Sequence, residues 1–555
     1  MLYKLSSSVT LALLLSACSA PNEPSEQQLS ARPAAIEAHL QFLASDELEG
    51  RDTGSRGHQI AANYIASQFQ ALGLAPAGDN NSYFQQVPLR SARVQQDSVK
   101  LSISRGETVR QLSYPQQFFS GASINQTEVA VSAPLVFVSY GLVSEEFGLN
   151  DYAGLDVTGK IVVQLAGLPA SLPSEERAYL GSIKGKLAAE RGAIGVITIH
   201  TPQQEKNRPY ANSLLYLNTP RLAWLTADGE PGNGNSQLQA AAYLHPDAAA
   251  GLFEQEQHSL ADIFGMLDAG QHPAGFDLSS GASLSASSSH QQISSPNVIA
   301  VLEGSDPTLA DEYVVITAHS DHIGFSNDLR SEDKINNGAM DNAAGMAILL
   351  ETARMFSELA VKPKRSILFV VVTAEEKGLL GADYFATNPT RPIERLVANV
   401  NLDMPVLLYP FADLIAFGAN HSTLGQVVAE AAAKEGIALS PDPMPEQAIF
   451  TRSDHFTLVK QGVPAVFLMT GFTSKDPEQD GAKIWGSFFA KHYHKPSDDI
   501  ASLTKEYGPL RYDAGAVFAD INFNTARDIA NTPQRPLWKA DSFFNKVFGK
   551  DYNRE

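Results

Sequence analysis

Several residues that can bind a metal ion follow apolar runs, or the turns between such runs, from residue 314 onward. Imidazole and carboxylate groups together are typical zinc ligands, whereas carboxylates alone suit magnesium or calcium. One carboxylate shared by two ions, with two further ligands for each ion, requires five protein ligands, and the chain supplies them with acidic residues to spare. The candidates are His319, Asp321, Asp341, Glu375, Glu376, Asp403 and His494.

Parallel strands would bring these residues together. Predicted strands alternate with predicted helices from residue 291 to about residue 530, which indicates an α/β fold. We expect a mostly parallel mixed sheet sandwiched by helices, with the site at the carboxyl ends of the strands. The strands are expected near Val314, Ser366, Ala398 and Pro464, and the helices near Ala343, Gly381 and Leu424.

The candidate residues and their local motifs resemble those of the co-catalytic di-zinc aminopeptidase family, which includes leucyl aminopeptidases, glutamate carboxypeptidase and glutaminyl cyclase. This resemblance implies a zinc exopeptidase fold, two zinc ions and a peptide substrate. His319 and Asp403 would hold one zinc ion, Glu376 and His494 would hold the other, and Asp341 would bridge the two ions.

The resemblance also implies roles for the neighbouring residues. Glu375 would act as the general base, and Asp321 would orient the ring of His319. Tyr493 matches a position at which some relatives stabilise the tetrahedral intermediate, and a packed tyrosine is the alternative. The Asp341–Asn342 peptide is expected to be cis. Three other histidines are expected to be structural, namely His322, His455 and His492.

The composition limits the class of protein. A chain of 555 residues with 44% hydrophobic content can bury a sizeable core and exceeds one ordinary domain. The formal net charge of −20 argues against a nucleic-acid partner, because phosphate contacts need clustered lysine and arginine. We therefore expect a globular protein of two domains. The composition predicts no particular oligomeric state.

Changes in local composition and motifs divide the chain into predicted domains. The segments Asp156–Val162 and Arg191–Ile197 resemble a protease-associated domain, which implies a smaller α/β or β-rich insert. The Ser-rich stretch Ser279–Ser295 reads as low-complexity sequence at a domain boundary. The predicted parts are 33–128, the N-terminal part of the peptidase domain; 129–290, the insert; 291–530, the catalytic domain; and 531–555, a C-terminal tail.

The N-terminal segment resembles the leader of a bacterial lipoprotein. A basic residue and a short apolar stretch precede Leu15-Ser16-Ala17-Cys18, and Cys18 is the only cysteine. We expect a signal peptide over residues 1–17, lipidation at Cys18 and a tether over residues 18–32. Ser19 resembles the outer-membrane sorting pattern, so the enzyme would be lipid-anchored in the cell envelope, facing the periplasm or the exterior. An ordinary secretory leader is the alternative.

Three rival functions remain. Glutaminyl cyclases use a histidine where this chain has Phe467, and a carboxypeptidase of the glutamate type would need an arginine cluster. A non-catalytic binding protein on the same fold is expected to have lost ligands, whereas this chain keeps all five and the base. The sequence thus favours an aminopeptidase that removes N-terminal residues from peptides.

Overall fold

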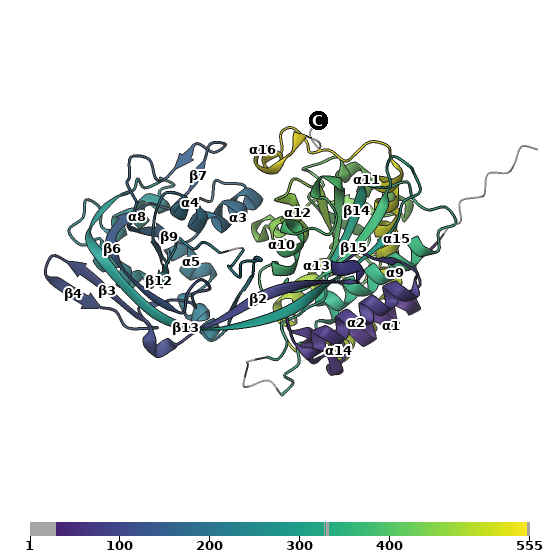
Figure 1. The fold of residues 1–555 in the computed structure, drawn as a ribbon, viewed down its shortest axis with the longest axis horizontal. Coiled ribbons are helices and arrows are strands. Elements are labelled where there is room, and N and C mark those ends of the chain that lie inside the picture. The colour runs from purple at the N-terminus through teal and green to yellow at the C-terminus, as the bar shows by residue number, and fades with distance from the viewer. Residues whose placement is uncertain (1–28, 233, 327, 329–331, 552–555) are drawn as a thin grey trace, which may run out of the picture.

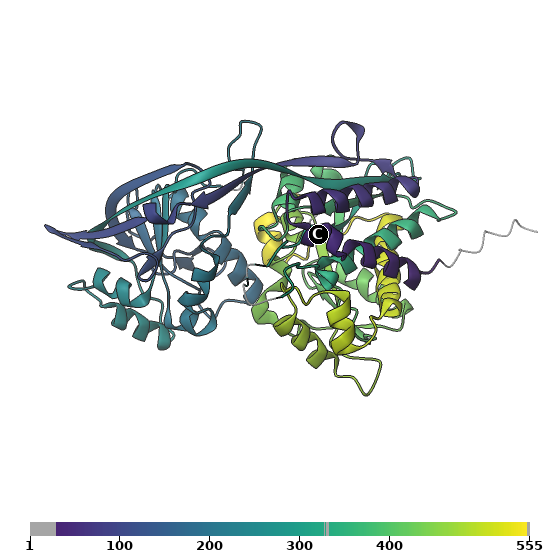
Figure 2. The same ribbon diagram turned by 90° about the horizontal axis from the view of Figure 1, so that it is seen from below.

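The computed structural model describes residues 29–232, 234–326, 328 and 332–551. The chain forms two lobes, which we call the main lobe and the insert lobe (residues 95–287). A ribbon of two antiparallel strands, β2 (Phe84–Val94) and β13 (Phe276–Leu302), runs along one side of the molecule and joins them (Figures 1 and 2). Cys18, the predicted lipidation site, lies outside the described residues.

The main lobe is built on a mixed sheet whose central strands are parallel. Along the sheet the order is β13, β15, β14, β16, β19 and β17, with the two outer strands antiparallel to their neighbours. The bounds are β14 (Tyr313–His319), β15 (Ser366–Val372), β16 (Leu396–Leu402), β17 (Asp413–Phe417) and β19 (Ala465–Thr470). The expected mostly parallel sheet is confirmed.

Helices cover both faces of this sheet. One face packs against α1 (Pro33–Leu43), α2 (Arg56–Ala71), α9 (Gly345–Ser357), α11 (Leu424–Lys434) and α15 (Tyr512–Asn531), and the other against α10 (Leu380–Thr387) and α12 (His455–Val459). Among the described residues, no helix is long and apolar enough to span a membrane.

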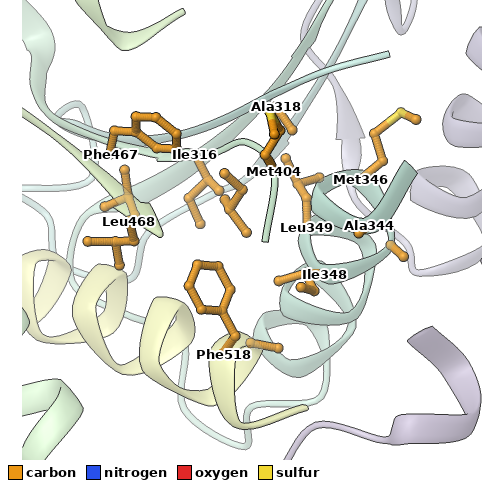
Figure 3. Packing of buried hydrophobic residues seen from close by; sticks show 14 of the residues in the cluster. Ile316, Ala318, Ala344, Met346, Ile348, Leu349, Met404, Phe467, Leu468 and Phe518 are labelled. Carbon is orange, nitrogen blue, oxygen red and sulfur yellow. The ribbon is translucent and has the colours of Figure 1, made fainter. Parts of the chain in front are cut away.

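Strand β14 shows why the central strands read as unbroken apolar runs. Val314, Ile316 and Ala318 point into the core beneath α9, whereas Tyr313 and Val315 point into the core beneath α10. Successive side chains of a strand face opposite sides, so a strand covered on both faces needs apolar residues throughout. Figure 3 shows Ile316 and Ala318 beside Ile348 and Leu349 of α9.

The insert lobe has its own mixed sheet, which also contains β13. The strand order is β4, β3, β13, β6, β9, β10, β12 and β5. The bounds are β3 (Lys100–Arg105), β4 (Thr108–Gln111), β5 (Phe118–Phe119), β6 (Glu128–Phe137), β9 (Ile161–Leu165), β10 (Gly195–Ile199) and β12 (Ala240–Leu244), with helices α3 (Ser174–Ser182), α4 (Lys184–Glu190) and α8 (Leu260–Asp268). The lobe therefore includes strands from Lys100 onward, ahead of the residue 129 at which we expected the insert to begin.

The Ser-rich stretch, expected as low-complexity sequence at a domain boundary, is regular β-strand where the chain passes between the two lobes. It lies within β13, which continues through both sheets. Burial alternates along it, with Leu278, Ser280, Ala282 and Leu284 buried. The backbone of this stretch is satisfied by β3 and β6, which pair with β13 on its two sides.

The two lobes also touch on the side away from the ribbon, where α3 meets α16 (Phe543–Phe548) (Figure 1). The Tyr179 ring packs edge-on against Phe543 and Phe548. The Glu175 carboxylate lies 2.8 Å from Nε2 of the main-lobe residue His421. Both a ribbon and a second contact therefore fix the insert lobe beside the main lobe.

Candidate metal centre

The ends of three adjacent parallel strands supply most of the candidate ligands. His319 is the last residue of β14, and Asp403 directly follows β16. Glu375 and Glu376 follow β15 after a short turn through Ala374, which has a positive φ of 55°. Because β14 lies between β15 and β16, their carboxyl ends meet at one edge. The predicted gathering of these side chains is observed.

Asp341 enters from a different element, the π-helical turn Ala339–Ala344 that precedes α9. The peptide bond between Asp341 and Asn342 is cis, which confirms the expectation from the resemblance. His494 comes from the segment after α13 (Gly481–Lys491) and has a positive φ of 57°. Left-handed non-glycine residues are uncommon, and they gather where a site imposes the backbone direction.

The first group of ligands is His319, Asp341 and Asp403. Nε2 of His319 lies 3.4 Å from Oδ1 of Asp341 and 3.2 Å from Oδ1 of Asp403. All three side chains are buried or nearly so. The other oxygen of Asp403 accepts a hydrogen bond from Oγ of Ser453 at 2.7 Å, which leaves Oδ1 directed at His319.

The second group is Asp341, Glu376 and His494. Nε2 of His494 lies 3.2 Å from Oδ2 of Asp341 and 3.1 Å from Oε2 of Glu376. Asp341 thus turns one oxygen to each group. Burial and Asp341 alone would raise the pKa of Glu376, but His322 and His494 outweigh them and lower it to about 2.

The donor atoms fit zinc. Nδ1–H of His319 donates to the backbone carbonyl oxygen of Asp321 at 3.1 Å, so the lone pair of Nε2 faces Asp341 and Asp403. One imidazole and two carboxylates in each group form a nitrogen and oxygen set of the kind zinc binds. These residues would hold two ions, with Asp341 between them.

Asp321 does not orient His319 in the predicted manner. Its carboxylate is 3.9 Å from Nδ1 of His319, and its backbone carbonyl makes the hydrogen bond instead. The carboxylate accepts the backbone N–H groups of Glu375 at 3.0 Å and Glu376 at 3.3 Å, and the hydroxyl of Thr53 at 3.1 Å. Asp321 therefore links the turn after β14 to the turn that carries both glutamates.

A pocket opens beside the two groups. Asp341, Glu375 and Asp403 line its floor. Burial raises the pKa of Glu375 well above its usual range, and the neighbouring carboxylates of Glu376 and Asp403 add to this effect. The apolar wall consists of Met404, Ile449, Phe467, Met469, Trp485 and Phe489.

Tyr493 also lines this pocket. Its ring stacks on Phe489 at 4.6 Å and on His494 at 3.8 Å between centroids. Burial, followed by Asp341 and Glu376, raises the pKa of the Tyr493 phenol, so it stays protonated at neutral pH. The hydroxyl is therefore available as a hydrogen-bond donor.

The structure brings in residues that sequence reasoning left outside the site. His322, expected to be structural, has Nδ1 2.7 Å from Oε1 of Glu376. Asp498 and Arg51 lie behind the turn that carries Asp341. The available signals were the position of His322 beside Asp321 and of Asp498 beside His494. The other two histidines lie elsewhere: His455 packs against Phe450 and Phe467, and His492 bonds to Ser497 and Glu506.

Comparisons with known proteins agree with this geometry. Residues 297–507 match the profile of peptidase family M28. The aminopeptidase YwaD of Bacillus subtilis is 27% identical over 197 residues, which are 35% of this chain and 38% of that protein. Leucine aminopeptidase 2 of Trichophyton rubrum is 27% identical over 256 residues, 43% of this chain and 46% of that one. The matches thus span less than half of each relative.

Among solved structures, an aminopeptidase from Aneurinibacillus sp. strain AM-1 has the same fold. It superposes with a TM-score of 0.50 at 20% identity, over 93% of this chain and 97% of that chain. All of the clustered ligands lie within the segment that matches the family profile. The segment 297–507 is therefore similar to peptidase family M28.

Proposed function

We propose that the protein is a zinc-dependent aminopeptidase that hydrolyses the N-terminal peptide bond of peptides. The observation that carries this proposal is the placement of Asp341, whose two oxygens face two different histidines, His319 and His494. A shared carboxylate of this kind suits a pair of metal ions. The names of the relatives, aminopeptidases and zinc metalloproteases, support the same activity.

Zinc, when bound, would supply the Lewis acidity that polarises the scissile carbonyl and activates a water molecule. Glu375 faces the same pocket and would take the proton of that water, then pass it to the leaving amine. The Tyr493 hydroxyl would donate to the oxyanion.

The pocket wall suggests the substrate's first residue. Ile449, Phe467, Met469 and Trp485 present apolar side chains, and the charged groups of the lining are three carboxylates and Arg452. A free N-terminal amine would lie toward the floor carboxylates, and an apolar side chain would fill the wall. We therefore expect apolar N-terminal residues to be favoured.

Zinc content and a substrate panel test this function. The full chain is expected to bind two zinc ions and to release a chromogenic amine from aminoacyl amides, fastest with leucine or phenylalanine. EDTA should abolish release, and added zinc should restore it. A protein that binds no zinc and releases no amine is a binding protein. Cyclisation of N-terminal glutamine without amine release from the other amides identifies a glutaminyl cyclase.

We also propose that the insert lobe is a protease-associated domain and that Cys18 anchors the protein in the bacterial cell envelope, on the outer membrane. Stable anchoring needs more than one acyl chain, since each buried methylene contributes only about 0.8 kcal/mol. Cys18→Ser should move the protein from the membrane fraction to the soluble fraction with unchanged specific activity. A Cys18→Ser protein that stays with membranes contradicts the anchor.

A further inference from the structure

Arg51 is a fully buried arginine whose hydrogen bonds go to backbone carbonyl oxygens. Nε donates to Ser320 at 3.1 Å, Nη1 to Asn337 at 2.6 Å and Nη2 to Gly338 at 3.2 Å. Nη1 also donates to Leu43. A buried cation is costly unless its donors are satisfied, and this planar fork satisfies them across segments far apart in sequence.

Two of these segments carry metal ligands. Ser320 lies between His319 and Asp321, in the turn after β14, and Gly338 lies just before the π-helical turn that holds Asp341. One guanidinium group thus joins the backbone beside the terminal ligand His319 to the backbone beside the bridging carboxylate.

The rest of the same turn, residues 49–53, reinforces the connection. The backbone carbonyl of Arg51 accepts the N–H of His322 at 3.1 Å, and that of Gly50 accepts the N–H of Gly324 at 3.0 Å. The Thr53 hydroxyl donates to Oδ2 of Asp321 at 3.1 Å. Residues 49–53 therefore form hydrogen bonds with the turn after β14 at several positions along it.

The backbone of residues 49–51 is strained. Glu49, Gly50 and Arg51 have consecutive positive φ values of 51°, 69° and 50°. A Cβ atom on Gly50 would lie 2.6 Å from the carbonyl oxygen of Gly324 and 2.7 Å from that of Asn336. Left-handed non-glycine residues cost about 1 to 3 kcal/mol each and persist where the surroundings enforce them. The hydrogen bonds of Arg51 to the ligand-bearing turns are among the contacts that enforce this backbone.

The positive charge of Arg51 is also compatible with its buried position. Burial lowers its pKa to about 10, while the carboxylates of Asp341 and Asp498 act in the opposite direction, so the group remains charged at neutral pH. The acidic side chains of the metal centre thus compensate the buried cation from beyond hydrogen-bonding distance.

We propose that Arg51 is a positioning residue for the metal pair: it holds the turns that carry His319 and Asp341 at the separation that lets both bind one ion. This inference rests on the proposed function, since it takes these residues as zinc ligands. The hydrogen bonds of Arg51 go to backbone carbonyls and to none of the candidate ligand side chains.

The test compares two buried arginines in the full chain. Arg51→Lys keeps the charge but cannot span the carbonyls, whereas Arg365→Lys alters an equally buried arginine that bonds to Glu312 and to carbonyls of residues 529, 532 and 533. Zinc affinity is measured by chelator competition, and melting temperature on the EDTA-treated proteins. Groups that support metal ligands typically contribute about 10- to 100-fold in affinity.

Arg51→Lys is expected to weaken zinc binding by that factor and to change the visible spectrum of the cobalt-substituted protein. Arg365→Lys is expected to lower the melting temperature and leave zinc affinity unchanged. A folded Arg51→Lys protein with the affinity and cobalt spectrum of the original chain overturns the inference. If the original chain binds no zinc, the proposed function has failed instead.

Thr53→Val provides a second route if Arg51→Lys does not fold. It removes only the hydroxyl that donates to Asp321 and leaves the guanidinium in place. Weaker zinc binding with little change in melting temperature supports the positioning role of residues 49–53. Unchanged zinc affinity in the Thr53→Val protein overturns the part of Thr53 only; for the guanidinium itself, a folded Arg51→Gln protein with unchanged zinc affinity overturns the inference.

Discussion

The carboxylate of Asp498 accepts the backbone N–H of Asp341 at 3.2 Å. It also accepts the N–H of Met340 at 3.0 Å, and its backbone carbonyl accepts the N–H of Ala339 at 2.9 Å. Asp498 follows His494 closely in the chain. The segment that supplies a ligand of one metal group therefore also holds the turn that presents the bridging carboxylate.

Asp498→Asn is expected to weaken the binding of both zinc ions by about 10- to 100-fold. The amide offers one oxygen, whereas two N–H donors need acceptors. Asp499→Asn is the matched control, since Asp499 caps α14 (Ile500–Tyr507) through Ser502 and asparagine caps as well. Chelator competition measures both proteins. Equal zinc affinities for the two variants would show that Asp498 does not position Asp341.

Removal of the bridge should differ from removal of a terminal ligand. Asp341→Ala takes one oxygen from each metal group, so zinc content should fall at both positions. His494→Ala affects one group only and should leave about one zinc ion per chain. Elemental analysis after dialysis measures the content. Loss of one zinc ion from both variants alike contradicts the bridging role.

The sequence predicts the candidate ligands better than it predicts the residues that position them. His319, Glu376 and Asp403 follow buried strands, and adjacency of parallel strands places strand ends together without any knowledge of side-chain packing. Arg51 could not be found this way, because its acceptors at Asn337 and Gly338 lie 286 and 287 residues away in sequence. Only the tertiary fold brings them together.

Two other differences have the same origin. The resemblance implied that the carboxylate of Asp321 would orient His319, but that carboxylate accepts the N–H groups of Glu375 and Glu376 instead. The composition of Ser279–Ser295 suggested low-complexity sequence at a domain boundary, but pairing with strands distant in sequence makes it part of one long strand that passes between the lobes. Partners distant in sequence decide both cases.

Tyr493→Phe tests the oxyanion role. The aromatic stacking on Phe489 and His494 is kept, and only the hydroxyl is lost. Turnover should fall, by up to about a hundred- to a thousand-fold if the hydroxyl is a main oxyanion donor, with little change in KM. Steady-state kinetics on the best aminoacyl amide measures both constants. A variant with normal turnover identifies Tyr493 as a packing residue only.

Zinc binding should depend on pH through His494. In the EDTA-treated protein burial lowers the pKa of His494, but Asp341 and Glu376 outweigh it and raise the pKa from 6.5 to about 10. Zinc needs the neutral imidazole, so affinity should rise with pH until the pH reaches about 10, with a proton released on binding below that pH. Calorimetry in buffers of different ionisation enthalpy measures that proton. Affinity independent of pH contradicts the assignment.

The same shift has the opposite sign for the stability of the EDTA-treated protein. The folded-state pKa of His494 is raised, so its contribution to stability is fully present below pH 6.5 and is lost as the pH rises toward 10. His494→Gln should remove this part of the pH dependence. Thermal unfolding of both proteins across that range measures it, and parallel curves would exclude the contribution.

The most direct measurement of the proposed chemistry is the turnover of Glu375→Gln at full zinc occupancy. Glu375 lines the pocket floor but belongs to neither ligand group. The variant should bind two zinc ions with normal affinity and lose about a hundred- to ten-thousand-fold in turnover, the usual contribution of general base catalysis. A Glu375→Gln protein with two zinc ions and near-normal turnover would contradict the account.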